Sequence, residues 1–182
     1  MKSTLVIHPK DESTSFLKQI YTNKNVSVVT GEVTKTTLQN MILGYDRIIM
    51  MGHGSSDGLL AVNQFDTDSS HIIDDSFIDV LKRKENSIYI WCHADQFVRK
   101  FNLKGFYTGM FISEVSEANY LGLTGTKQVE VNESNFYFSN LVSQYMAYSL
   151  ENMFVKVKEH YGMLSELNTV ANYNFNRLYL NS

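Results

Sequence analysis

The chain has 182 residues, of which 43% are hydrophobic and one is proline, and its formal net charge is -3. This length allows one well-covered hydrophobic core, and the composition excludes a disordered or fibrous chain. The charge excludes the basic surface that a nucleic acid or an acidic lipid would need. A single cysteine cannot form a disulfide within the chain, and the first residues, "MKSTLVIHPKDES", lack the pattern of a signal peptide. We therefore expect one domain over residues 1–182, located in the cytoplasm, with no membrane span.

The first third of the chain alternates short apolar runs with segments of helical spacing. The apolar runs predict buried strands, and the third of them, "RIIMM", is typical of a central strand covered on both faces. Asp11 or Ser13 is the expected N-cap of the first helix, and Gly44 is the expected end of the second. In chain order we predict a strand at 3–9, a helix near 16–20, a strand at 25–31, a helix near 38–42 and a strand at 47–51.

The middle of the chain continues this alternation after a glycine-rich loop. "GLLAV" and "HII" predict a small hairpin or an excursion at the edge of the sheet, and Asp74 or Asp75 is the expected cap of a helix over "DSFIDVLKRKE". "SIYIW" predicts a fourth buried strand and "DQFVRKF" a helix. The later elements are a fifth strand, "GFYTGMFIS", a short helix around Ala118 and Leu121, and a sixth, more exposed strand, "TKQVEV".

The last part of the chain has a long amphipathic pattern. From Phe138 to Val157 the apolar positions keep helical register, which predicts one long helix near 134–160 whose apolar stripe packs on the core. A C-terminal tail near 163–182 is expected to hold a last helix. Strand and helix segments that alternate in this way predict an α/β fold, with a mostly parallel sheet of about six strands and helices on both faces.

Two consecutive predicted strands end in residues that carry chemistry. His53 follows "RIIMM" within the motif "IIMMGHGSSDG", and Cys92 follows "SIYIW". Parallel strands in one sheet present their carboxyl ends at the same edge, where ligands of such folds bind. We therefore expect an imidazole and a thiol to lie side by side, an arrangement that can convert the thiol into a nucleophilic thiolate.

Glycines on both sides of His53 fit the same interpretation. Without side chains, Gly52 and Gly54 would let a substrate carbonyl approach. The Gly54 amide and the Cys92 amide are candidate donors to the oxyanion that forms when the nucleophile attacks. Asp57 and Asp95 are candidates for a third residue that orients His53, and His93 is expected to have a structural role. His8 ends the first strand and is expected at the surface, near the rim of the same cleft.

The motifs "HGSSDG" and "WCHAD" together resemble the caspase-like cysteine peptidases, a group that includes caspases, metacaspases, gingipains, clostripain, separase and bacterial CHAT domains. The segment "FNLKGFYTGMFISEVSEANYLGL" is similar to part of the CHAT-type domains. The resemblance covers residues 3–131. It implies a three-layer caspase-like sandwich and a cysteine endopeptidase in which His53 is the general base and then acid, and Cys92 is the nucleophile. It implies no cofactor and a peptide or protein as substrate.

The residues that would select the substrate follow the family less closely. In metacaspases an acidic residue two positions before the nucleophile helps to bind a basic side chain, whereas this chain has Ile90 there. Glu114 and Asp57 are the candidate substrate-binding residues. Glu114, together with Glu117, would suit a basic side chain. Lys10 lies where caspases have an arginine that binds an acidic substrate side chain. Specificity for a basic side chain and specificity for an acidic side chain therefore both stay open.

Two other interpretations of the same residues differ in class. His53, Cys92, His93 and Asp95 could form a zinc site, although adjacent Cys-His residues rarely bind one ion. A catalytically silent caspase-like domain, or a flavodoxin-like binding module with a regulatory or defence role, would have the same strand pattern without covalent chemistry. The oligomeric state does not follow from the sequence.

Overall fold

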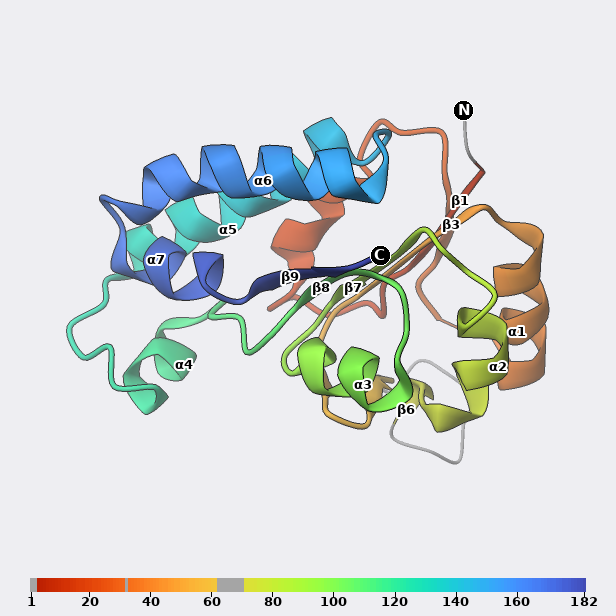
Figure 1. The fold of residues 1–182 in the computed structure, drawn as a ribbon. Coiled ribbons are helices and arrows are strands. Elements are labelled where there is room, and N and C mark those ends of the chain that lie inside the picture. Colours follow the sequence, from red (N-terminus) through yellow and green to blue (C-terminus); the bar gives the residue numbers. More distant parts are fainter. Residues whose placement is uncertain (1–2, 32, 62–70) are drawn as a thin grey trace.

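A six-stranded sheet forms the centre of the protein, as a computed structural model that describes residues 3–31, 33–61 and 71–182 shows (Figure 1). The strand order is β2-β1-β3-β7-β8-β9, and all neighbours are parallel except β9, which pairs antiparallel with β8. The predicted α/β class with a mostly parallel sheet is confirmed. The strands are β1 (Thr4–Ile7), β2 (Ser27–Val29), β3 (Arg47–Met51), β7 (Ser87–Ile90), β8 (Gly105–Thr108) and β9 (Leu178–Asn181).

Helices cover both faces of this sheet because successive residues of a strand point to opposite sides. In β3, Ile48 and Met50 belong to the core under one group of helices, whereas Ile49 and Met51 belong to the core under the other group. The first group is α1 (Lys35–Gly44), η2 (Asp75–Phe77), α2 (Ile78–Leu81) and α3 (Ala94–Phe101). The second is η1 (Ser15–Ile20), α5 (Gln128–Tyr145), α6 (Leu150–Ser165) and α7 (Thr169–Phe175).

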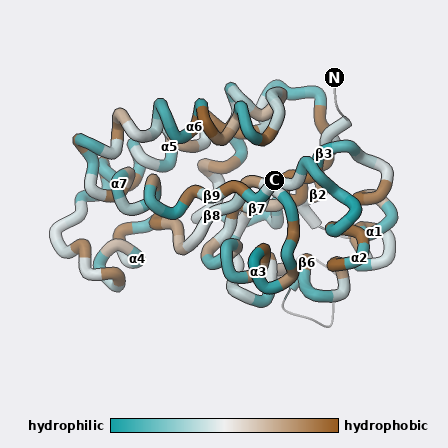
Figure 2. The backbone as a smooth tube through the Cα atoms, viewed as in Figure 1, coloured by the Kyte–Doolittle hydropathy of each residue, from teal (hydrophilic) through white to brown (hydrophobic). Residues whose placement is uncertain are grey.

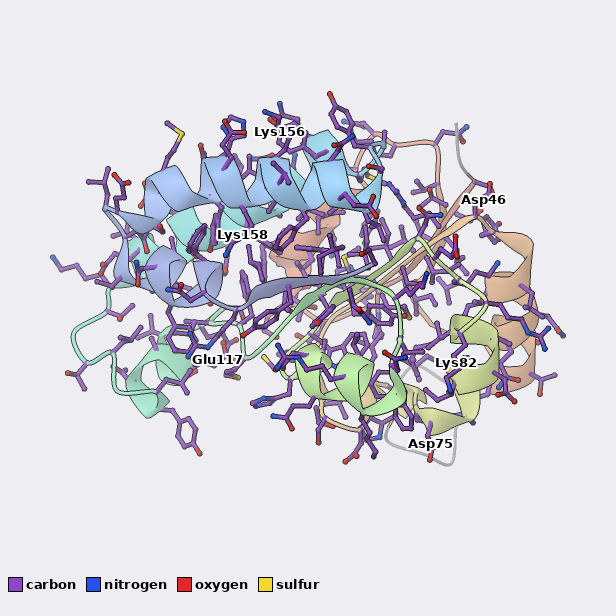
Figure 3. All side chains as sticks on the ribbon, viewed as in Figure 1. Asp46, Asp75, Lys82, Glu117, Lys156 and Lys158 are labelled. Carbon is purple, nitrogen blue, oxygen red and sulfur yellow. The ribbon has the colours of Figure 1, made fainter. Side chains whose placement is uncertain are left out.

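The hydropathy of the chain follows these layers. Hydrophobic residues lie along the strands and on the inner sides of the helices, and hydrophilic residues predominate on the outer turns (Figure 2). Charged side chains such as Asp75, Lys82 and Lys156 project from the outer surface (Figure 3). Among the helices of the described residues, none is both long and apolar enough to cross a membrane.

A second, three-stranded antiparallel sheet follows β3. It consists of β4 (Gly54–Ser55), β5 (Gly58–Leu60) and β6 (His71–Ile73), in the order β4-β5-β6. The hairpin predicted from "GLLAV" and "HII" is therefore present as β5 and β6, although residue 62 of the first segment lies outside the described residues.

Three predicted elements in the C-terminal half were wrong. The expected sixth strand at 126–131 is instead the start of α5, where Val131 is buried and Val129 is 66% exposed. The single long helix near 134–160 is two helices, since the chain turns at residues 146–149 and Ser149 caps α6 by accepting the Asn152 N–H. The fifth strand ends at Thr108, before residue 113.

The C-terminal tail is more ordered than expected. After α7 the chain forms β9, and Tyr179 stacks on Tyr107 of the neighbouring strand β8. The short helix α4 (Val115–Tyr120), predicted around Ala118, lies between β8 and α5. This arrangement leaves residues 109–114, between β8 and α4, beside the carboxyl end of β7.

Candidate active site

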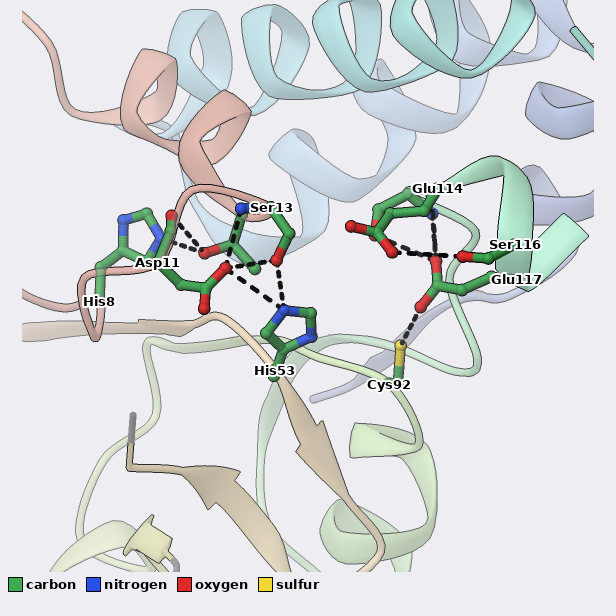
Figure 4. A network of polar contacts seen from close by, with 10 residues as sticks. His8, Asp11, Ser13, His53, Cys92, Glu114, Ser116 and Glu117 are labelled. Atoms are coloured by element: carbon green, nitrogen blue, oxygen red, sulfur yellow. Dashed lines mark hydrogen bonds and ion pairs between the residues drawn. The ribbon is translucent and has the colours of Figure 1, made fainter. Parts of the chain in front are cut away.

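The two strands that carry the predicted dyad are neighbours. β3 pairs parallel with β7 in a register that places Met51 beside Ile90, so the residues that follow both strands emerge at the same edge. His53 and Cys92 both line one narrow cavity of about 20 Å³ at this edge. The structure therefore brings the two predicted catalytic residues to one place (Figure 4).

His53 has partners that the sequence did not predict for it. Its Nε2 lies 2.6 Å from Ser13 Oγ and 3.6 Å from Asp11 Oδ1. Asp11 Oδ1 also accepts the N–H of Ser13 at 2.8 Å and the Ser13 hydroxyl, and these hydrogen bonds, the hydroxyl first, hold the pKa of Asp11 below its ordinary value. The His53 side chain remains 33% exposed.

These contacts replace the helix cap that we expected from Asp11 or Ser13. The N-cap of η1 is Thr14, with no hydrogen bond from its side chain to the helix. Asp11 and Ser13 instead form a tight turn directly after β1, next to the end of β3. Their position after a strand end was the signal that could have identified them, because the carboxyl ends of parallel strands line the site.

Cys92 is held on the other side of the cavity. Its thiol donates to the Phe111 carbonyl oxygen at 3.5 Å, and its sulfur lies 4.0 Å from Glu117 Oε1. Burial, with the nearby Glu117 carboxylate second, raises the pKa of the thiol to about 11. The thiol is therefore protonated at neutral pH, and a base would have to remove its proton before it could act as a nucleophile.

Backbone conformation explains the glycine at position 52, and side-chain packing explains the glycine at position 54. Gly52 has a φ of +145°, which favours glycine whatever its surroundings. A Cβ at Gly54 would collide with the Trp91 indole ring and lie 2.8 Å from Gly58 O. Indole packing, reinforced by a Trp91 Nε1–H bond to Ser55 O at 3.0 Å, thus explains Gly54, instead of the expected space for a substrate.

The Gly54 amide, a candidate oxyanion donor, is not used by the β4–β5 ladder. Leu60 N–H donates to His53 O at 2.9 Å, so His53 and Leu60 form a hydrogen-bonded pair of the β4–β5 ladder. Such pairs alternate along antiparallel strands, and the next pair is Gly54 with Leu59. The alternation therefore leaves the Gly54 N–H outside the ladder.

The two aspartates expected to orient His53 lie elsewhere. Asp57 is 69% exposed on the β4–β5 turn and lies 3.8 Å from Lys100 Nζ. Asp95 is in the first turn of α3 and lies 3.9 Å from Arg99. Among the described residues, Asp11 is the carboxylate in ion-pair contact with His53, and Asp57 does not line the cavity at Cys92.

Two further histidines have structural positions. His93, at φ +66°, precedes α3, and its Nδ1 contacts Gln96. His8 is only 1% exposed, so its expected place at the surface was wrong. Its ring nitrogens contact Tyr21 Oη and Thr14 Oγ1, and burial, with the charge of Lys18 second, lowers its pKa to about 4.

A larger cleft of about 460 Å³ adjoins the cavity, with which it shares Phe16 and Ser113. Glu114 and Glu12 both line it and supply two carboxylates to its wall. The described residues that line this cleft include no lysine, arginine or histidine. Glu117 is not among them, because its carboxylate accepts the N–H groups of Ser113 and Glu114. Lys10 is exposed and lines neither space.

Within the described ranges, no group of three or more histidine, cysteine, aspartate or glutamate side chains is arranged to hold a metal ion. His53, Cys92, His93 and Asp95 thus do not come together as a zinc site. Comparison of the chain with models of known protein families gives no match, and no curated protein is similar to it at a significant level.

Proposed function

We propose that the protein is a cysteine endopeptidase with a caspase-like, three-layer fold, in which His53 and Cys92 form the catalytic dyad. The observation that carries this proposal is that one cavity, at the carboxyl ends of two neighbouring parallel strands, is lined by both side chains. An imidazole beside a protonated thiol is the arrangement that thiol-based acyl transfer requires.

The reaction would proceed in two stages. His53 takes the proton of Cys92, and the thiolate forms a bond to the carbonyl carbon of the substrate while the carbonyl oxygen becomes an oxyanion. The Gly54 and Cys92 amides would donate to this oxyanion. The carbon–nitrogen bond then breaks, and the amine leaves with the proton from His53. Water, deprotonated by His53, attacks the thioester and releases the acid and the free thiol.

The larger cleft supports a peptide with a basic side chain next to the cleaved bond. Glu114 and Glu12 supply negative charge, and the cleft meets the dyad cavity at Phe16 and Ser113. A lysine or arginine side chain would find charge-assisted hydrogen bonds there, whereas an acidic side chain would meet like charge.

A peptide mixture read by mass spectrometry tests this function. The native protein should cleave after lysine or arginine, and Cys92→Ala and His53→Ala should each lose at least about 10³-fold in kcat/KM. Labelling of the native thiol with iodoacetamide across pH is the measurement that needs no substrate. We expect the rate to rise with pH and His53→Ala to raise the apparent pKa of the thiol further. A thiol that reacts only after unfolding would contradict the proposal.

The buried, protonated thiol also favours a second candidate, a catalytically silent binding module. In that case Cys92 is a packing residue that bonds to Phe111 O. A ligand would then raise the melting temperature of the native protein and of Cys92→Ala by the same amount, and no peptide would be cleaved.

A further inference from the structure

The turn after β1 determines which nitrogen of His53 carries a proton. Ser13 Oγ lies 2.6 Å from His53 Nε2 and also donates to Asp11 Oδ1 (Figure 4). A serine hydroxyl has one hydrogen, so it can donate to only one of these two partners. The question is which partner receives it.

The state of Asp11 answers this question. An aspartate carboxyl is ionised at neutral pH by its ordinary pKa, and Asp11 Oδ1 also accepts the Ser13 N–H at 2.8 Å, which favours the ionised form. An ionised carboxylate only accepts hydrogen bonds. The Ser13 hydrogen therefore belongs to Asp11, and the Ser13 oxygen must accept a hydrogen from His53. His53 Nε2 is consequently the protonated nitrogen.

This assignment leaves Nδ1 to exchange a proton with Cys92. In Figure 4, Nδ1 lies on the side of the ring nearer to Cys92, and both residues line the same cavity. We propose that Ser13 and Asp11 are positioning residues: they hold His53 with its hydrogen on Nε2, so that Nδ1 receives the proton of Cys92, and the Asp11 carboxylate stabilises the imidazolium that results. The inference rests on the proposed function for the role of Cys92, but not for the tautomer of His53.

The other ionisable groups around the pair do not take over this role. Glu117 lies 4.0 Å from the sulfur and disfavours a thiolate. His8, behind Thr14, is neutral at pH 7, because burial lowers its pKa to about 4. Lys18 acts on His8. Among the described residues with an ion-pair contact to His53, Asp11 is the one that can balance a charge on its ring.

Nitrogen NMR of the histidine ring tests the tautomer directly. In protein labelled with ¹⁵N-histidine, with the His53 signals assigned by comparison with His53→Ala, the neutral ring should carry its hydrogen on Nε2. Ser13→Ala should give a mixture of tautomers, and Ser13→Thr, which keeps the hydroxyl, should restore the single form. A native His53 with its hydrogen on Nδ1 would overturn the inference.

Kinetics test the link to Cys92. We expect Ser13→Ala to lower kcat by about 10- to 100-fold and Asp11→Asn by about tenfold, since both act on the proton transfer. Asp11 lines neither the cavity nor the cleft, so Asp11→Asn should keep KM within about twofold, whereas Ser13 also lines the cleft and only kcat is decisive for Ser13→Ala. Both variants should also slow iodoacetamide labelling of Cys92 at pH 7–8 by about tenfold and shift its profile to higher pH. Glu159→Gln, an exposed acid on α6, is the charge-matched control.

The outcomes separate this inference from the proposed function. If the native protein has the Nε2 hydrogen but cleaves no peptide, the function fails and the tautomer assignment stands. If peptides are cleaved and neither Ser13→Ala nor Asp11→Asn changes kcat or the labelling profile, the inference fails and the function stands. If Ser13→Ala abolishes cleavage while Cys92→Ala retains it, Ser13 is the nucleophile and both are wrong.

Discussion

Two segments hold the two strand ends of the candidate site, and each brings a carboxylate with a different consequence. Residues 8–14 pack on His53 and present Asp11, whereas residues 111–117 pack on Cys92 and present Glu117. A carboxylate stabilises a positive charge beside it and disfavours a negative one. Asp11 can therefore balance a positive charge on the imidazole ring, whereas Glu117 opposes the loss of the proton from Cys92.

The Cys92 thiol keeps its proton in the resting site. The thiol has a pKa of about 11, and Ser13 and Asp11 contact the imidazole at Nε2. A thiolate in such a site would be a transient species, formed as His53 takes the proton. The two segments also differ in how they are anchored, because His8 ties the first to the core and Asn174 ties the second.

The largest effect is expected at the anchor of the Cys92 side. Asn174 is fully buried, its Oδ1 accepts the Ile112 N–H at 2.7 Å, and its Nδ2 donates to Ile112 O and Ser134 Oγ. Asn174→Ala leaves these buried groups without partners, which should destabilise the protein by about 4 kcal/mol in urea unfolding. It should also speed labelling of Cys92. Asn172→Ala, at an exposed position of α7, should cost less than about 0.5 kcal/mol. Equal stabilities would show that Asn174 is not the anchor.

The anchor of the His53 side should make stability depend on pH. The pKa of His8 falls from 6.5 to about 4 on folding, because the ring is buried. As the pH falls from 6.5 towards 4, the unfolded chain binds a proton that the folded protein does not, so about 3 kcal/mol of stability present above pH 6.5 is lost.

Urea unfolding between pH 7 and pH 4 measures this loss. Glutamine at position 8 cannot titrate. The His8→Gln protein should therefore lose about 3 kcal/mol less stability than the native protein between pH 7 and pH 4. Asp11 does not interfere, since its lowered pKa makes its own contribution disappear only at lower pH. An identical pH dependence in both proteins would mean that His8 is not kept neutral by burial.

Much of the fold follows from local sequence, because strands covered on both faces need continuous apolar runs. β1, β3, β7 and β8 fit this description and were predicted, as was the edge strand β2, and the order of β3 and β7 along the chain placed His53 and Cys92 at one edge. β9 was missed because its residues are half polar, and it becomes a strand only where the edge of β8 offers partners. The break between α5 and α6 has no proline or glycine, and Ser149 as a helix cap was its only local signal.

The candidate dyad could be predicted from the sequence, but the side chains that contact it could not. His53 and Cys92 follow from topology, whereas Ser13 meets His53 across 40 positions of sequence, and Glu117 meets Cys92 across 25. A local pattern around Asp11 and Ser13 is typical of a helix cap, so their turn had an adequate local explanation. Side-chain partners of this kind depend on how loops from distant segments pack, which no single window of sequence contains.

A smaller effect is expected where the two strand ends touch each other. The Trp91 ring packs against Gly54, so Gly54→Ala forces the indole or the β4 backbone to move and should cost about 2 kcal/mol. Gly44→Ala is the matched control: nothing lies within 4 Å of a Cβ there, and alanine in a helix should be neutral or stabilising by up to about 1 kcal/mol. Thermal unfolding compares the two, and a Gly54→Ala protein as stable as the native one would show that Gly54 is not constrained by packing.

The smallest effect is expected when the charge of Glu117 or of Asp11 is removed while the shape of the side chain is kept. Glu117→Gln removes the negative charge beside Cys92 and keeps a carbonyl oxygen for the N–H groups of residues 113 and 114. Because that charge raises the pKa of the thiol, the variant should lower it and speed iodoacetamide labelling at pH 8 by about tenfold, equivalent to about 1.4 kcal/mol. Asp11→Asn should slow the same reaction, and Glu151→Gln, at the exposed start of α6, should leave it unchanged. If Glu117→Gln and Asp11→Asn shift the rate in the same direction, the carboxylates do not act oppositely on the dyad. The thiol would then respond to the net charge of the site and not to the imidazole.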